Sequence, residues 1–351
     1  MTRSLDQQGK HDVEQRAKSS WRPVNVLAVA PGIALCALAT AGALGVNHWL
    51  PTVSPLLIAI VFGAVAANIA PLPQRLQPGL QFSAKRLLRV GVAMLGLQLV
   101  LGDILHLGYG VIVIVISIVL LGIAGTVFVG KLLGLTWTQR LLIACGFSIC
   151  GAAAVAAVDG VIEAKDEDDV PTAVALVVIF GTLLIPVIPT CAVALGLSNS
   201  AAGVWAGGSI HEVAQVVAAA ATMGGGALGV AVVVKLARVL MLAPVMAVLS
   251  VRQRRIAAST TDVKRPPLVP LFVLAFIVCV VLRSSGVVSV QLLQYSKIIQ
   301  VALLTAAMFA LGTGVHASIF KKVGPRPFVL AIISTVWVAT VALAGVMVVF
   351  R

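Results

Sequence analysis

The feature that most constrains this chain is a succession of apolar runs, each roughly 15 to 25 residues long and almost free of charge. An α-helix needs about 20 apolar residues to cross the hydrocarbon core of a bilayer. Hydrophobic residues make up 60% of the 351 residues and charged residues 11%, whereas soluble domains carry about a quarter charged residues. The chain is therefore expected to be an all-α polytopic membrane protein.

The runs are bounded by Pro, Gly and charged residues, and they predict about eleven transmembrane helices. The predicted spans are Val24–Val46, Val53–Ala70, Leu87–Leu101, Tyr109–Val129, Leu141–Val158, Val170–Cys191, Val204–Met223, Ala227–Val251, Leu268–Leu282, Ile298–Val315 and Phe328–Phe350. Residues 1–23 are polar and predict a cytoplasmic tail, which leaves residues 24–351 as a single transmembrane transporter domain.

Loop charges predict the orientation, because cytoplasmic loops carry an excess of Lys and Arg. Most of the 25 basic residues fall in the tail and in alternate loops, so the N-terminus is expected inside and the C-terminus outside. The acidic run Asp166–Asp169 falls in a loop that this count places outside. The net charge of +13 is then a topology signal, and no nucleic-acid partner is expected because basic residues form no stripe with aromatic residues.

Three ionisable residues fall inside predicted spans, namely Glu212, Lys235 and Arg238. A charge within the membrane costs several kcal/mol on insertion scales, so such residues face the bundle interior and mark functional sites. Lys235 and Arg238 are three residues apart and share a helix face. Two positive charges against one negative favour a bound anion, which Lys235 and Arg238 are expected to bind directly. Alternatively, Glu212 neutralises one of the bases as a buried packing pair.

Two segments resemble each other at a constant offset of 61 residues, Gly146–Ala157 and Gly207–Ala218, with six of twelve positions identical. Gly, Ser and small residues in mid-span are typical of a broken membrane helix, whose half-helix N-terminus attracts anions. These segments predict an anion site that includes Gly146, Ser148, Gly208 and Ser209. The alternative is that the small residues only allow close helix packing. With eleven spans, the two segments would run in the same direction, unlike inverted transporter repeats.

The densest polar cluster inside the membrane is His211, Glu212 and Gln215. It is interpreted as a proton-coupling or charge-modulating group beside the anion. The pattern is close to a His-Glu-x-x-His zinc motif, but Gln215 stands at the fifth position and is a poor ligand. An intramembrane metal-dependent enzyme using His211 and Glu212 remains the competing interpretation. No metal or other cofactor is otherwise expected, and the absence of a Walker motif in the sequence favours a secondary carrier over ATP-driven transport.

Several stretches resemble the YeiH-like bacterial membrane proteins, a family named for sulfate export. They are Gly146–Gly151, Trp205–Val216 and Val234–Arg238, within a likeness that extends from Lys85–Gly91 to Phe309–Gly312. The resemblance implies a multi-pass protein of the bacterial inner membrane that transports sulfate or a related sulfur oxyanion. It leaves the direction of transport, the coupling ion and homo-oligomerisation open.

Overall fold

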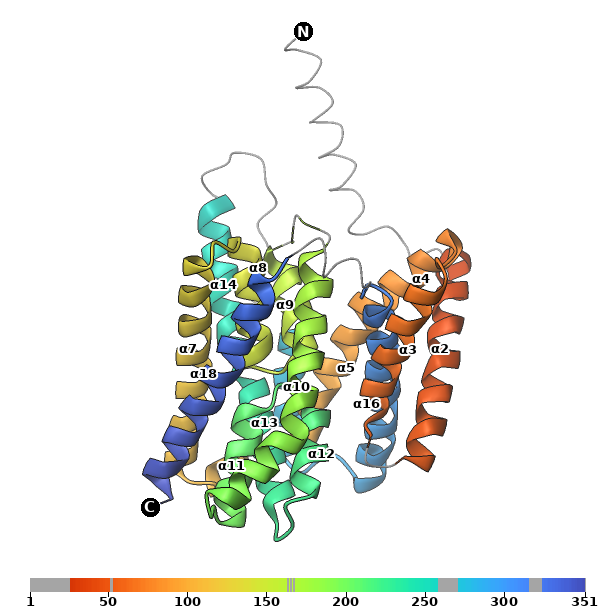
Figure 1. Ribbon diagram of the computed structural model, residues 1–351. Helices are drawn as coiled ribbons and strands as arrows, with labels where there is room; N and C mark the ends of the chain where they lie inside the picture. Colours follow the sequence, from red (N-terminus) through yellow and green to blue (C-terminus); the bar gives the residue numbers. More distant parts are fainter. Residues whose placement is uncertain are drawn as a thin grey trace.

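The computed structural model describes residues 26–50, 53–162, 164, 166, 168–257, 271–315 and 324–350. Within these ranges the regular structure is helical and contains no strand, which confirms the all-α prediction (Figure 1). The polar tail predicted for residues 1–23 lies outside the described residues.

Six continuous helices are long and apolar enough to cross a membrane by their length and composition. They are α2 (Val26–Trp49), α7 (Tyr109–Leu132), α10 (Asp169–Ala194), α13 (Ala227–Leu240) continued by α14 (Leu242–Ala257), α16 (Val290–Gly312) and α18 (Arg326–Val349). Two of the shorter apolar helices, α3 (Pro55–Ile69) and α15 (Leu271–Ser284), pack with these, as do α4 (Gln77–Phe82) and α5 (Leu88–Leu95). The chain is thus a multi-span helical protein.

The span predicted at Leu87–Leu101 begins earlier in the structure. Helical backbone runs without interruption from α4 (Gln77–Phe82) through a π-helical stretch to α5 (Leu88–Leu95). A 3-10 turn ends it at Gln98. Lys85 and Arg86 therefore lie within this helix, in its π-helical stretch, and a short helix, α6 (Leu101–His106), follows at the opposite end.

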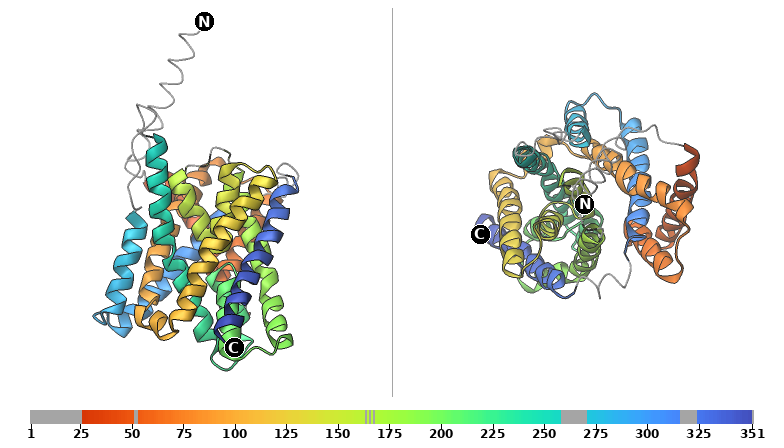
Figure 2. Two further views of the ribbon diagram at one scale, coloured as in Figure 1. Left: turned by 90° about the vertical axis from the view of Figure 1, so that its left-hand side faces the viewer. Right: turned by 90° about the horizontal axis from the view of Figure 1, so that it is seen from above.

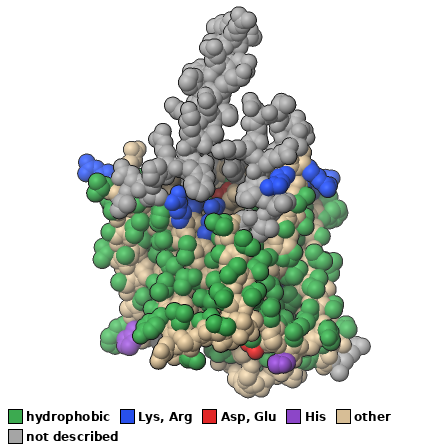
Figure 3. Space-filling view, turned by 180° about the vertical axis from the view of Figure 1, so that it is seen from behind, with side chains coloured by type: hydrophobic (Ala, Val, Ile, Leu, Met, Phe, Trp, Pro, Cys, Tyr) green, Lys and Arg blue, Asp and Glu red, His purple; other side chains and the backbone are tan. Residues whose placement is uncertain are grey.

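Basic side chains gather at one end of the bundle, which we call the basic end (Figure 3). It is defined by the described residues Arg75, Lys85, Arg86, Lys131, Arg140 and Arg326. Two histidines, His48 and His106, lie at the helix ends that face the other way. This asymmetry is what the loop-charge analysis predicts for a membrane protein.

Two of the predicted spans, Leu141–Val158 and Val204–Met223, are each a pair of half-length helices. The first consists of α8 (Trp137–Ser148) and α9 (Ala152–Ile162), and the second of α11 (Asn199–Ser209) and α12 (Val213–Ala221). At 1.5 Å per residue α8 is about 18 Å long, against about 30 Å for the hydrocarbon core. Neither half crosses a bilayer alone.

The first pair forms a hairpin that enters from the basic end. Arg140 of α8 lies against Gly130 near the basic end of α7, while Ser148 lies against Gly122 in the middle of that helix. Helix α9 then returns, since the Arg89 side chain at the start of α5 lies against Gly160. Asp169, which follows the hairpin, is beside Gln139 of α8. The acidic run was expected at the outer end, so the placement of Asp169 at the basic end corrects that prediction.

The second pair enters from the opposite end (Figure 1). Asn199 at the start of α11 lies against Gly225, just beyond the end of α12. Helix α11 runs beside α13 toward the middle of the bundle, with Gly203 and Gly207 packed on the carbonyl groups of Ala227 and Ala231. The two hairpins therefore have inverted orientations, and the prediction that both segments run in the same direction is wrong.

Viewed from the basic end, the helices form two groups (Figure 2). The hairpin bundle consists of α7 to α14 and α18, and the α16 bundle consists of α2 to α5, α15 and α16. Helix α16 packs mainly on α3, α5 and α2. The two bundles touch chiefly through α5 with α9, α10 with α16 and α14 with α15, and their buried apolar residues form one continuous core.

The hairpin topology predicts which loops share a membrane side. In a cysteine-free background, Asp166→Cys and Ser200→Cys are both exposed reporters. We expect a membrane-impermeant maleimide added to intact cells to label Ser200→Cys but to label Asp166→Cys only after lysis, because these residues lie at opposite ends. Labelling of both from the same side would contradict the two inverted hairpins.

Candidate functional site

The tips of the two hairpins meet in the middle of the hairpin bundle. The first tip is the Ile149-Cys150-Gly151 break between α8 and α9, and the second is the Ile210-His211-Glu212 break between α11 and α12. The backbone N–H of Ala152 donates to Glu212 Oε1 at 3.1 Å. Gly151 has a φ of +78°, and a Cβ there would stand in the Glu212 side chain. A glycine is therefore required where the tips touch.

Arg238 on α13 is fully buried, and every hydrogen bond of its guanidinium goes to a backbone carbonyl of a hairpin. From the first hairpin it binds Phe147 O at 2.8 Å and Ser148 O at 3.2 Å. From the second it binds three carbonyl groups, Gly207 O at 3.1 Å, Gly208 O at 2.7 Å and Ile210 O at 3.1 Å. One side chain thus joins the ends of α8 and α11.

Lys235, also fully buried, makes the same kind of link one turn earlier on α13. Its Nζ donates to Ile149 O at 3.0 Å and to Ile210 O at 2.8 Å. No ion pair joins Glu212 to either base among the described residues, so the simple packing pair considered from the sequence is not formed.

The hydrogen bonds of Lys235 and Arg238 satisfy the open carbonyl groups that a broken helix leaves at its C-terminal ends. The last carbonyl groups of a helix have no intrahelical partner and carry a partial negative charge. Because α8 and α11 both end in the fully buried middle of the bundle, those carbonyl groups need donors from the protein. Lys235 and Arg238 supply the donors and the opposite charge together.

Glu212 occupies the complementary position at the N-terminal ends of α9 and α12. It is the N-cap residue of α12, where a capping box pairs it with Gln215, whose Oε1 accepts from the Glu212 N–H at 3.1 Å. Its carboxylate also accepts from Ala152 at the start of α9. Helix N-termini carry partial positive charge and stabilise an anion. Glu212 is therefore an internal anion at two half-helix N-termini.

Both ends of the Gln215 amide group are engaged within the protein. Its Nε2 is directed at α10, toward Val178 O at 3.3 Å and Thr182 Oγ1 at 3.5 Å. The predicted cluster of His211, Glu212 and Gln215 is contiguous, but its three side chains turn to different helices.

His211 turns to α18, where its Nε2 lies 3.2 Å from Thr335 Oγ1. The Thr335 hydroxyl donates its hydrogen to Ala331 O at 2.8 Å, so Nε2 of His211 is the donor in this contact. The other ring nitrogen, Nδ1, is buried and has no partner among the described residues. The imidazole also packs on Phe147, with ring centroids 4.3 Å apart.

Ser148 and Ser209 occupy equivalent positions, because each is the last residue of its half-helix. Both are completely buried, and both hydroxyl oxygens lack a hydrogen-bond partner within the described ranges. A buried unpaired hydroxyl costs about 1–3 kcal/mol. Such a group in each hairpin, together with His211 Nδ1, marks the tips as a site with unused hydrogen-bonding capacity.

Gly146 and Gly208, the two glycines of the predicted site, allow neighbouring helices to pack closely, and Gly208 also offers its backbone carbonyl as an acceptor. A Cβ on Gly146 would meet Val155 and Val177, so this residue allows the arms of the first hairpin to close on α10. Gly208 allows close approach of α7 and α18 at Ile118 and Ala342, and its carbonyl is a partner of Arg238.

The metal-dependent alternative finds little support in this geometry. His211 and Glu212 contact different helices, α18 and α9. In the described part of the chain, no three His, Cys, Asp or Glu side chains come together as ligands.

The sequence did not reveal Thr335, the α18 residue that orients His211, or the carbonyl groups of Ile149 and Ile210. A threonine in an apolar helix carries no distinguishing signal, and backbone acceptors carry none at all. All nine predicted site residues nevertheless lie in or beside the hairpin tips, with Gly146 and Gln215 the most remote.

Comparison with known proteins identifies the family. A family model described as "Conserved hypothetical protein 698" matches residues 31–331. The chain belongs to this family. It is 55% identical over 315 residues to a UPF0324 membrane protein of Corynebacterium glutamicum, covering 90% of this chain and 91% of that protein. The UPF0324 inner membrane protein YeiH of Salmonella typhi is 35% identical over 321 residues, covering 88% of this chain and 90% of the relative.

A UPF0324 membrane protein of Listeria monocytogenes is 33% identical over 303 residues, covering 85% of this chain and 89% of that protein. No solved structure matches the chain. The predicted resemblance to YeiH-like proteins and the multi-pass inner-membrane location are both confirmed. The names of these relatives state no substrate.

Removal of the Arg238 side chain should destabilise the protein severely. Arg238→Met would leave four carbonyl groups without a side-chain donor, since only Ile210 O keeps one in Lys235, so we expect a loss of about 3 kcal/mol or more. Arg238→Lys keeps the charge but cannot form the same fork, so it should fall between the wild type and Arg238→Met. The measurement is the thermal unfolding midpoint in detergent.

The matched control is Arg75→Met, since Arg75 is exposed at the basic end. It should leave the midpoint within about 1 °C, as surface changes cost little. Equal effects of Arg238→Met and Arg75→Met would refute a structural role for Arg238.

Proposed function

We propose that this protein is a secondary transporter that moves a small inorganic or organic anion by alternating access. Sulfate and related sulfur oxyanions are the first substrates to test. The observation that carries the proposal is the crossing of two inverted half-membrane hairpins whose polar tips are buried beside Lys235, Arg238 and Glu212. Broken helices that meet near the midplane are the usual way in which transporters present backbone groups to an ion.

The balance of charge at the tips favours an anion. The half-helix dipoles contribute two negative ends, which face Lys235 and Arg238, and two positive ends, which face Glu212. With these dipoles balanced, two full positive charges stand against one carboxylate. A bound anion would neutralise the remaining charge, which is costly to leave uncompensated in a membrane.

The N-terminal ends of α9 and α12 offer the donors for that anion. The N–H groups of Ala153, Val213 and Ala214 have no described partner, because the first N–H groups of a helix lack intrahelical acceptors. All three residues are half-buried. Lys235 and Arg238, whose hydrogen bonds go to the hairpin backbone, would then attract the anion by their charge without contacting it directly.

The Ser148 and Ser209 hydroxyl groups would supply further donors when one hairpin shifts against the other. They are the unpaired donors nearest to the carbonyl ends of the half-helices. Movement of the hairpin bundle along the α16 bundle would expose the site to each side in turn. The limited contact between the two bundles supports this view.

The proposed topology has nine crossings and two half-membrane hairpins in place of eleven crossings. The crossings are α2, α3, the continuous helix from α4 to α5, α7, α10, the pair α13 and α14, α15, α16 and α18. An odd number places the start of α2 and the end of α18 at opposite ends (Figure 1). We assign the basic end to the cytoplasm, as the excess of basic residues requires.

The proposal is tested with purified protein in liposomes. We expect saturable uptake of labelled sulfate, sulfite or another small anion, driven by an ion or proton gradient. The double variant Ser148→Ala and Ser209→Ala should reduce uptake at least tenfold, because two donors to the anion are lost.

The matched control is Ser250→Ala. Ser250 is also completely buried and unpartnered, but it lies on α14 away from the tips. It should leave uptake within twofold of wild type. No gradient-driven accumulation of any anion tested, or equal losses in both variants, would count against the proposal.

Glu212 is proposed to couple transport to protons, because its carboxylate lies at the same half-helix N-termini as the N–H groups offered to the substrate anion. Its neighbours are the Ala152 N–H, His211 and Lys235. Glu212→Gln keeps an acceptor for Ala152 but removes the negative charge. We expect this variant to bind and exchange the anion while losing accumulation driven by a pH gradient, whereas Asp103→Asn at the exposed α6 should behave as wild type.

A further inference from the structure

A tryptophan at the basic end of the hairpin bundle carries two guanidinium groups. Trp137 is the first residue of α8 and follows the short turn after α7. The guanidinium carbon of Arg252, on α14, lies 3.9 Å from the centroid of the Trp137 ring. That of Arg140, one turn further along α8, lies 5.1 Å from the ring centroid. Helices α8 and α14 thus hold two positive charges at one aromatic ring.

In the described part of the chain, this pair of cations has no counter-charge. No carboxylate within those ranges forms an ion pair with Arg140 or Arg252, and the buried Nε of Arg140 has no hydrogen-bond partner there. The two like charges repel each other, and a negative ligand in contact with both would offset that repulsion. An arginine that packs on an aromatic face can still direct its N–H fork at a phosphate. The pair is therefore suited to an oxyanion.

The two arginines and the tryptophan lie at the level of lipid headgroups. Arg252 is 14 residues beyond Arg238 on the helical span formed by α13 and α14, which is about 21 Å along the helix. Trp137 is 11 residues before Ser148 on α8, or about 16 Å. Arg238 and Ser148 mark the middle of the bundle, and the headgroups of a bilayer lie between about 15 and 22 Å from its midplane. The ring is thus at the hydrocarbon boundary, where tryptophan is enriched.

The face of α14 that carries Arg252 is apolar and exposed toward the middle of the membrane. Val248, one turn earlier on the same face, is 67% exposed. Pro244, one turn before Val248, is also exposed, as is Arg252 itself. On a membrane-spanning helix, such an apolar face contacts acyl chains. Arg252 therefore lies where a lipid beside α14 would place its headgroup.

We propose that Trp137, Arg140 and Arg252 form a binding site for the phosphate group of an anionic phospholipid in the leaflet at the basic end. The two guanidinium groups would bind the phosphate oxygens, and the Trp137 ring would hold both groups in position. An acyl chain would lie along Val248 and Pro244 of α14.

Other basic residues at the turn between α7 and α8 favour a lipid with a net negative charge. Lys131 in the last turn of α7 is exposed. The Arg326 side chain at the start of α18 lies against Gly134 in the turn itself. Basic side chains at the membrane surface attract anionic headgroups and disfavour the positive group of a zwitterionic one.

A bound phosphate would connect two elements of the candidate functional site. Trp137 begins the first arm of the first hairpin, and Arg252 belongs to the helical span that carries Lys235 and Arg238. The lipid would therefore fix the start of this hairpin relative to the helix that binds its tip. Lipid binding at this place is separate from the hairpin tips and does not depend on transport.

The test is lipid binding by the purified full-length protein. After delipidation in detergent, the protein is titrated with phosphatidylglycerol or with phosphatidylcholine of the same acyl chains, and bound lipid is counted by native mass spectrometry. We expect one site that prefers phosphatidylglycerol about tenfold. Arg252→Gln should weaken phosphatidylglycerol binding about fivefold, and Arg140→Gln combined with Arg252→Gln should abolish the preference.

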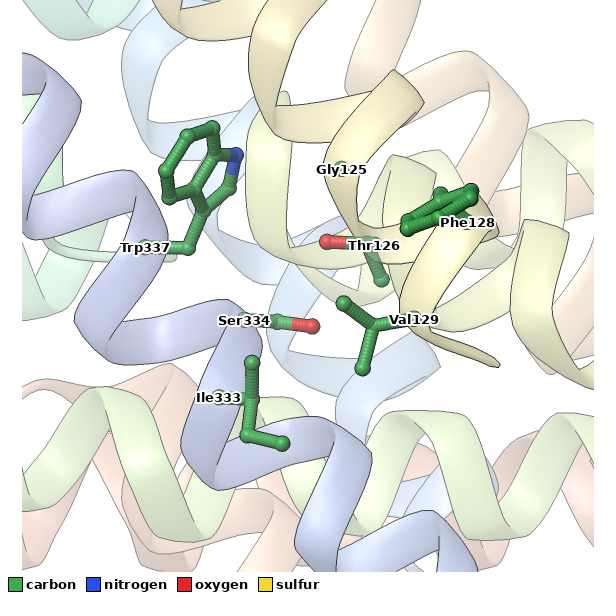
Figure 4. Close-up of a pocket in the computed structure, with 7 residues that line it drawn as sticks. All are labelled: Gly125, Thr126, Phe128, Val129, Ile333, Ser334 and Trp337. Carbon is green, nitrogen blue, oxygen red and sulfur yellow. The ribbon is translucent and has the colours of Figure 1, made fainter. Parts of the chain in front are cut away.

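Trp137→Leu distinguishes this site from a diffuse basic surface, because it changes no charge. We expect it to weaken phosphatidylglycerol binding about threefold, since the guanidinium groups lose the ring that positions them. The matched control is Trp337→Leu. Trp337 is 41% exposed and lines a cavity of about 280 Å³ between α7 and α18 (Figure 4), and none of the described residues that line this cavity is charged. This control should leave the binding of both lipids within twofold of wild type.

Arg86→Gln is the control for loss of one positive charge. Arg86 is exposed and lies over the Phe82 ring of its own helix at 5.5 Å, without a second cation at that ring. It should leave phosphatidylglycerol binding within twofold of wild type. Equal losses in Arg86→Gln and Arg252→Gln would overturn the proposal, because they would indicate a general attraction to basic residues.

The lipid is distinguished from a soluble anion by competition with inorganic phosphate. We expect equimolar inorganic phosphate to leave phosphatidylglycerol bound, since the acyl chains add contacts along α14. Displacement of the lipid would assign the site to a soluble anion and would refute lipid binding. Equal affinity of the wild type for the two lipids, or wild-type affinity in Trp137→Leu, would do the same. Arg252 is exposed, so Arg252→Gln should keep the wild-type unfolding midpoint and gives a valid comparison if the double variant does not fold.

Discussion

Seven hydrogen bonds from two neighbouring side chains hold the centre of this protein together. They run from Lys235 and Arg238 to carbonyl groups at the ends of α8 and α11. Without them, two helices would end inside the membrane with open acceptors, which a bilayer does not tolerate. The hairpin architecture therefore depends on this one set of contacts more than on the hydrophobic effect, which does not distinguish protein from lipid tails in the membrane interior.

The charged side chains at the hairpin tips are placed so that each one complements the helix ends it contacts. The bases lie at carbonyl ends and the carboxylate lies at N–H ends, so each full charge faces a partial charge of opposite sign. Inversion of the two hairpins makes this arrangement compact, because antiparallel entry brings both pairs of half-helix ends to the same level. A protein that only needed to pack its helices would have little reason to bury three ionisable groups there.

Much of the site could be predicted from the sequence, because charge within an apolar run is conspicuous. Lys235, Arg238 and Glu212 were found in this way, and the offset of 61 residues paired Ser148 with Ser209. What these residues contact could not be predicted. The bases were expected to bind the substrate directly, yet in the structure their hydrogen bonds go to the backbone of the hairpins.

Hydropathy alone could not predict the two hairpins. A run such as Val204–Met223 has the length and composition of a crossing, and hydropathy does not report whether the chain turns back at its middle. One signal was present in the loops. The connection between α10 and α11 contains no Lys or Arg, although eleven crossings would place it inside. With two hairpins, the connection between α10 and α11 lies at the end opposite the basic end, where few basic residues are expected.

The position of α13 in the chain has a consequence for biosynthesis. Both hairpins precede Lys235 and Arg238 in the sequence, and a polypeptide is made and inserted from its N-terminus. The hairpin tips must therefore wait in the translocation machinery or at a wet interface until α13 emerges with the donors that complete them. Assembly of the central site is a late event, and a chain truncated before residue 235 would retain most of its spans yet have no means of closing its core.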